Sequence, residues 1–151
     1  MEAKNYTKSE IESLIKRFEA RKLPKVEWTH PAHIVVAVWY TVHHGEEEAL
    51  DLVREFIKNH NEAVGTGNTD FDGYHETITK FWLWVAGQFL AGRKHEPIDI
   101  LCNGLITSEF GKSSHPLMYY SKELLFSVKA RHRWVNPDVQ SLNVLIGESQ
   151  N

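Results

Sequence analysis

Apolar side chains recur at helical spacing in the first part of the chain. Between Thr7 and Arg21 they occupy Ile11, Leu14, Ile15 and Phe18. Steps of three and four residues place these side chains on one face of a helix. Thr7 and Glu10 match a capping box, in which the two side chains satisfy backbone N–H groups at the helix start. We therefore predict an amphipathic helix from Thr7 to Arg21.

The second segment, from near Thr29 to His44, is apolar on every face. Its hydrophobic run is Ile34, Val35, Val36, Ala37, Val38 and Trp39. Pro31 is tolerated only in a first helical turn, so it places the start of the helix within a residue or two. A helix that is apolar all round is expected at the centre of a bundle.

Four more helical segments follow at short intervals. We predict them from Glu46 to about Ala63, from Asp72 or Gly73 to Ala91, from Glu96 to just before Gly111, and from Ser113 to Val128. Turn-forming residues fill 65–73 between the third and fourth helices, and the tail from about Arg131 is expected to be irregular. The pattern predicts one all-α domain over residues 1–151, a compact bundle of about five to six helices.

Composition narrows the class of protein. The 151 residues are 42% hydrophobic and 25% charged, with a formal net charge of −3, so neither a disordered chain nor a bulk nucleic-acid binder is expected. The longest apolar run, 34–40, is too short to span a membrane. No secretory signal is visible and Cys102 is the only cysteine, so a cytoplasmic location is predicted. A homo-oligomer is compatible with these data.

Nine histidines are an unusual number for this length, and three of them stand at the starts of apolar helices. His30 and His33 belong to Glu27-Trp28-Thr29-His30-Pro31-Ala32-His33. His75 belongs to Asp72-Gly73-Tyr74-His75-Glu76-Thr77-Ile78-Thr79. If these two helix starts meet in the bundle, His30, His33 and His75 converge on one buried pocket.

Three imidazoles are a sufficient first shell for a catalytic zinc ion that keeps one position open for water. Non-haem iron prefers two histidines and a carboxylate, which Glu27 or Glu76 could supply as a catalytic group. The leading hypothesis is therefore a mononuclear zinc or iron enzyme, hydrolytic or oxygen-using, that acts on a small molecule. A di-metal carboxylate site is disfavoured, because Pro31 and Gly73 place Glu27 and Asp72 ahead of their helices.

Two interpretations without a metal remain open. Helix N-termini attract anions, so the same region could bind a small anionic or polar ligand, with Arg131 and Arg133 adding donors. Tyr74, Thr79 and Trp82 would line that pocket, since Trp82 and Thr79 share a helix face with His75. Alternatively, the histidines only cap helices in a structural or interaction protein.

Three motifs carry a resemblance to known proteins. They are Glu27-Trp28-Thr29-His30-x-x-His33, Tyr74-His75-Glu76-Thr77-x-Thr79 and Ala130-Arg131-x-x-Trp134-Val135-x-Pro137-Asp138. Over nearly the whole chain they resemble a group of small bacterial proteins of unassigned function, which implies a single helical domain in a bacterial cytoplasm. In size and helix content the chain is also broadly similar to DinB-like bundles, whose histidines bind nickel or zinc.

Overall fold

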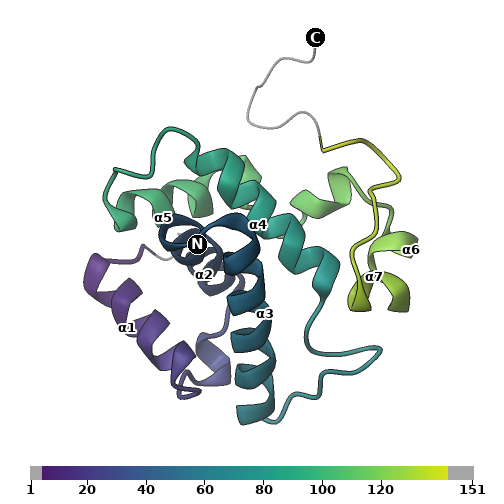
Figure 1. Ribbon diagram of the computed structural model, residues 1–151, viewed down its shortest axis with the longest axis horizontal. Coiled ribbons are helices and arrows are strands. Elements are labelled where there is room, and N and C mark those ends of the chain that lie inside the picture. Colours follow the sequence, from purple (N-terminus) through teal and green to yellow (C-terminus); the bar gives the residue numbers. More distant parts are fainter. Residues whose placement is uncertain (1–4, 143–151) are drawn as a thin grey trace.

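Helices form all the regular structure in the computed structural model, which describes residues 5–142. The five longer helices are α1 (Lys8–Glu19), α2 (His30–His43), α3 (Glu46–Ala63), α4 (Glu76–Leu90) and α5 (Ile98–Thr107), and two short ones are α6 (Lys122–Leu125) and α7 (Val128–His132) (Figure 1). Three 3-10 turns are η1 (Lys25–Glu27), η2 (Glu109–Gly111) and η3 (His115–Met118). The predicted all-α bundle is therefore confirmed. None of the described helices has the length and hydrophobicity that a membrane span requires.

The apolar second segment forms the central helix, as its sequence predicts. α2 packs against α1, α3, α4 and α5, and its apolar run from Ile34 to Val38 is buried throughout. Its N-cap is Thr29, whose side chain accepts a hydrogen bond from the Ala32 N–H. Contact on all sides explains why a helix with no polar face is stable here.

Two helix boundaries differ from those expected. α4 begins at Glu76 and not at Asp72 or Gly73, because the His75 side chain acts as its N-cap. The single helix expected from Ser113 to Val128 is instead divided into η3, α6 and the start of α7. Ser121 and Ser127 cap the N-termini of α6 and α7, so each serine starts a new helix where the periodicity alone suggests a continuous one.

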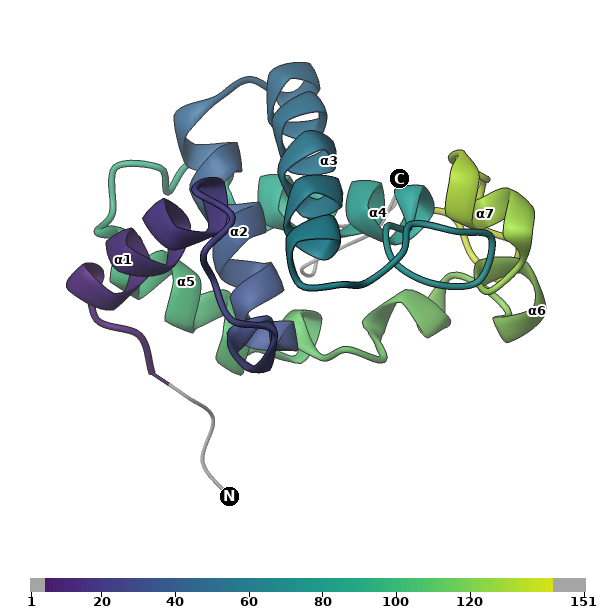
Figure 2. The ribbon, with the colours of Figure 1, turned by 90° about the horizontal axis from the view of Figure 1, so that it is seen from below.

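The irregular tail begins after α7 (Val128–His132), slightly later than the expected Arg131, and it is bonded to the start of α4. α7 extends to His132, and residues 133–142 contain no helix; the rest of the predicted irregular tail, 143–151, lies outside the described residues. The Thr77 hydroxyl donates to the Arg133 carbonyl at 2.9 Å and accepts from the Val135 N–H at 3.3 Å. These bonds hold α7 and the following residues beside the first turn of α4 (Figure 2).

Cys102 behaves as a small buried hydrophobic residue, as expected. It is fully buried on α5, and desolvation, with a contribution from Asp99, raises the pKa of its thiol to about 12. The thiolate is the nucleophilic form of cysteine, so the Cys102 side chain contributes to packing and not to chemistry at neutral pH.

Candidate functional site

His30, at the start of α2, bonds to the backbone of a distant turn. Its Nε2 lies 2.7 Å from the carbonyl oxygen of Gly111, and its ring meets the Trp82 ring edge-on at 5.1 Å between centroids. The imidazole therefore joins α2 to η2 across the core. Trp82 is buried against His30, Phe81 and His115, which makes it a core residue next to His30.

Both ring nitrogens of His75 are occupied by the backbone. Nδ1 accepts a hydrogen bond from the Ile78 N–H at 3.1 Å, so Nε2 carries the proton and donates to the Leu125 carbonyl at 2.8 Å. Burial, together with the charge of Arg131, lowers the pKa of His75, although the bond to Leu125 opposes the shift. The neutral imidazole caps α4 and ties it to α6, which agrees with the helix-capping interpretation of this histidine.

One ring nitrogen of His33, Nδ1, forms a hydrogen bond to the backbone. Its ring stacks on Trp28 at 3.7 Å between centroids, and Nδ1 donates to the Thr29 carbonyl at 2.7 Å. Desolvation is the main cause that lowers the pKa of His33 to about 4, helped by the nearby His30 and His60, while the bond to Thr29 opposes the shift. At neutral pH the ring is uncharged, and Nε2 is an acceptor.

The expected convergence of His30, His33 and His75 on one metal ion is not found. Each histidine bonds to a different carbonyl group, those of Gly111, Thr29 and Leu125. Within residues 5–142, no group of three histidine, cysteine, aspartate or glutamate side chains is arranged to hold a metal ion. The described residues therefore give no support to a zinc or iron site.

The two carboxylates proposed as catalytic groups lie in different surroundings. Glu27 is exposed and pairs with Arg17 of α1 at 2.9 Å. It lines a surface pocket with residues of α1 such as Ser9 and Ser13. Glu76 lines another pocket, beside α3 and α7, so the two residues do not serve one site.

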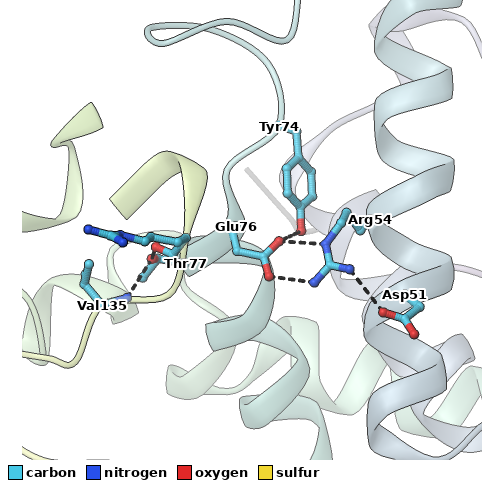
Figure 3. A network of polar contacts seen from close by, with 7 residues as sticks. Asp51, Arg54, Tyr74, Glu76, Thr77 and Val135 are labelled. Atoms are coloured by element: carbon cyan, nitrogen blue, oxygen red, sulfur yellow. Dashed lines mark hydrogen bonds and ion pairs between the residues drawn. The ribbon is translucent and has the colours of Figure 1, made fainter. Parts of the chain in front are cut away.

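Glu76 is the centre of a polar network between α3 and α4. Arg54 holds its carboxylate with two bonds, Nε to Oε1 at 2.9 Å and Nη2 to Oε2 at 2.7 Å, and the Tyr74 hydroxyl donates to Oε1 at 2.7 Å (Figure 3). Burial opposes ionisation of Glu76, but the hydrogen bonds from Arg54 and Tyr74 prevail and lower its pKa. Asp51 accepts a further bond from Arg54 at 3.1 Å. Glu76 is thus ionised and neutralised by its partners.

A pocket of about 380 Å³ opens beside this network. Its lining comes from α3, the loop before α4, the first residue of α4, α7 and the residues after α7: Arg54, Lys58, Glu62, Asn68, Thr69, Tyr74, Glu76, Arg131, His132, Arg133 and Trp134. Four side chains in this set are lysine or arginine and two are glutamate. We call it the basic pocket, because its lysine and arginine side chains outnumber its glutamates. One of the two glutamates, Glu76, is paired with Arg54.

Arg131 is held in this pocket by the backbone. Its Nη1 donates to the Gly73 carbonyl at 2.9 Å and lies 3.4 Å from that of Tyr74. No carboxylate of the described residues forms an ion pair with Arg131. The guanidinium is therefore held in position by the backbone and has no ion-pair partner among these residues.

A second pocket, of about 270 Å³, adjoins the basic pocket and shares Tyr74 and Arg131 with it. Two of the three histidines proposed from the sequence, His33 and His75, line it together with Thr79. The structure therefore places five proposed ligand-binding or metal residues around this pocket and its border, while His30, Trp82 and Glu27 lie elsewhere.

Arg54 and Lys58 are site residues that the sequence analysis misses. They lie four residues apart on α3, a spacing that puts both on one helix face. Solvated basic residues on a polar face have the same pattern, and only the packing of α3 against α4 shows that Arg54 reaches Glu76.

Acid should destabilise the fold through its neutral histidines. The pKa of His33 falls from 6.5 in the unfolded chain to about 4 on folding, and those of His75 and His115 also fall. Stability is therefore complete above the unfolded value and is lost as the pH drops toward 4, because the unfolded chain binds the protons. Since His33 is partly exposed, we expect its share to be about 1–2 kcal/mol between about pH 7.5 and about pH 5.

Urea unfolding at both pH values measures this loss, and the His33→Gln variant isolates the share of His33. The acid loss of stability should be smaller in the variant than in the natural chain. An equal loss in both proteins would show that His33 is not a source of the pH dependence.

Comparison of the chain with protein-family models, curated proteins and solved structures gave no significant match. The resemblance based on the three sequence motifs thus gains no support from these comparisons.

Proposed function

We propose that this protein binds a small anionic ligand, a phosphate or a carboxylate, in the basic pocket between α3, the loop at 64–75 and α7. The observation that carries the proposal is Arg131, a guanidinium fixed by two backbone carbonyls with no carboxylate partner among the described residues. Guanidinium groups bind carboxylate and phosphate oxygens with two parallel hydrogen bonds.

The charges around Arg131 favour an anion as well. Lys58 and Arg133 add positive charge to the same pocket, and neither is in an ion pair within residues 5–142. The ammonium of Lys58 lies over the Tyr74 ring, 5.2 Å from its centroid, which places it at the pocket wall. Cations gathered in one concave site raise the local concentration of anions.

The Glu76 carboxylate in this pocket does not prevent anion binding, because its charge is already paired with Arg54. Arg54 and Tyr74 supply three hydrogen bonds to its two oxygens. The pair formed by Arg54 and Glu76 is neutral as a unit. Glu76 also accepts a hydrogen bond from Tyr74, which holds Tyr74 at the pocket wall. A site whose donors are already in place loses little entropy when a ligand binds.

Isothermal titration with inorganic phosphate and with citrate tests the proposal. We expect at least one of the two anions to bind with one site per chain. Arg131→Gln, which removes the charge and keeps a hydrogen-bond donor, should weaken that binding by about tenfold or more.

Arg93→Gln is the matched control. Arg93 is also an arginine held by partners, in its case Glu96 at 2.9 Å, but it lines neither of the two pockets. Its replacement should leave the affinity unchanged. If neither anion binds, or if the two variants lose affinity equally, the basic pocket is not an anion site.

A further inference from the structure

The second pocket has the size and lining of a site for an aromatic ring. Its apolar side chains come from four separate parts of the chain: Trp28 after η1, Ile57 of α3, Ile78 of α4 and Phe126 after α6. About 270 Å³ is ample for a benzene ring, and concave sites that combine apolar and aromatic side chains with polar groups are typical ligand sites.

The polar groups of this pocket do not demand a charged occupant. His75 has no free ring nitrogen, because both are hydrogen-bonded to the backbone. His33 is uncharged at neutral pH, since its pKa is about 4, and its Nδ1 donates to Thr29. An uncharged ring therefore meets no buried charge in this pocket apart from Arg131 at the border with the basic pocket.

Arg131 and Tyr74 line both pockets, so a ligand group bonded to Arg131 would lie beside the second pocket. We propose that the natural ligand is an aromatic anion, an aryl phosphate or an aromatic carboxylate, with its charged group at Arg131 and its ring in the second pocket. This inference rests on the proposed function, because the charged group of the ligand uses the same arginine.

Phe126 gives the second pocket its accessible wall. Phe126 is 60% exposed although it is large and apolar. It follows α6 directly, next to the Leu125 carbonyl that accepts a hydrogen bond from His75. A ring that enters the pocket would cover part of the exposed Phe126 surface. Removing that surface from water would favour binding.

Isothermal titration with phenyl phosphate and with inorganic phosphate tests the inference, with benzoate and acetate as the carboxylate pair. We expect the aromatic member of at least one pair to bind about tenfold or more tightly than its simple counterpart, because burial of the ring adds a hydrophobic contribution. Phe126→Ser should remove most of that advantage and leave the affinity for inorganic phosphate or acetate unchanged.

Phe71→Ser is the matched control, since Phe71 is 77% exposed and lines neither pocket. Its replacement should leave the aromatic advantage intact. Equal affinity for the aromatic and simple anions would overturn the aromatic ligand while the anion site stands. An aromatic advantage that survives Phe126→Ser, or that falls equally in both variants, would place the ring outside the second pocket. Absence of binding by all four anions would overturn the anion site itself.

Discussion

Replacing Gly73 by alanine should lower the free energy of unfolding by about 3 kcal/mol, from backbone strain and lost hydrogen bonds together. Gly73 has a φ of 83°, a conformation that costs residues with a Cβ about 1–2 kcal/mol. A Cβ at this position would also lie 2.2 Å from the Gly67 carbonyl oxygen and 2.9 Å from the Asn68 Cα. The backbone of the loop would have to move.

Movement of Asn68 would release the loop from α3. The Asn68 side-chain oxygen accepts hydrogen bonds from Asn61 and from the Tyr74 N–H, both at 3.0 Å, and its amide nitrogen donates to the Lys58 carbonyl at 3.2 Å. The Gly73 carbonyl is also the acceptor for Arg131. The substitution should therefore weaken anion binding as well as stability.

Gly65→Ala provides the matched control for urea unfolding of Gly73→Ala. Gly65 has nearly the same φ, 82°, but a Cβ there would find nothing within 4 Å. It should cost only the backbone strain, about 1 kcal/mol. Equal losses in the two variants would mean that the close contact with Gly67 and Asn68 does not exist in the folded protein.

Arg54→Met should cost about 2 kcal/mol of stability, because it leaves the Glu76 carboxylate without its cation. The Glu76 side chain is only 13% exposed, whereas that of Arg54 is 34% exposed. Water can reach the pair from one side, so the loss should be smaller than for a fully buried ion pair. Chemical unfolding at neutral pH measures it.

A second substitution separates the ion pair from the packing of the Arg54 side chain. In the double variant Arg54→Met/Glu76→Gln no charged Glu76 is left beside the missing guanidinium, and only the exposed Asp51 loses its partner. We expect about 1–2 kcal/mol of coupling between the two positions. Arg93→Met, which breaks the more exposed pair with Glu96, should cost much less, because water screens an exposed ion pair. Additive effects of the two substitutions would show that the ion pair at the centre of the Glu76 network does not stabilise the fold.

Local signals in the sequence predict much of this fold. The capping box of Thr7 and Glu10 is present at the start of α1, and α3 spans Glu46–Ala63 as expected. Each signal acts within a few residues, through a side chain near a helix end or through the spacing of apolar positions. Where such signals are strong, the neighbours in the chain determine the local structure.

Other boundaries depend on contacts with distant segments. Ser121 caps α6, and its hydroxyl and N–H bond to Asp138 at 2.6 and 2.8 Å. This contact spans 17 residues, and periodicity over 113–128 cannot reveal it. The His75 side chain, which caps α4, likewise donates a hydrogen bond from Nε2 to the Leu125 carbonyl, 50 residues away in the chain.

The candidate site was predictable only in part for the same reason. Tyr74, Glu76 and Arg131 belong to motifs that stand out in the sequence, and they do line one pocket. Whether a histidine binds a ligand or forms a hydrogen bond to a carbonyl group depends on the segment packed against it. For His30 that segment contains Gly111. Lys58 and Arg54 acquire their role from the packing of α3 beside the loop at 64–75.

The position of a bound anion is the most direct test of the proposed site. Crystals grown without phosphate or sulfate and soaked in sodium tungstate, a heavy-atom analogue of phosphate, give that position from anomalous scattering. We predict a tungsten peak in the basic pocket, with tungstate oxygens in hydrogen-bond distance of the Arg131 guanidinium, and no such peak in crystals of Arg131→Gln. Peaks confined to other surfaces, or a peak in the pocket that persists without Arg131, would contradict it.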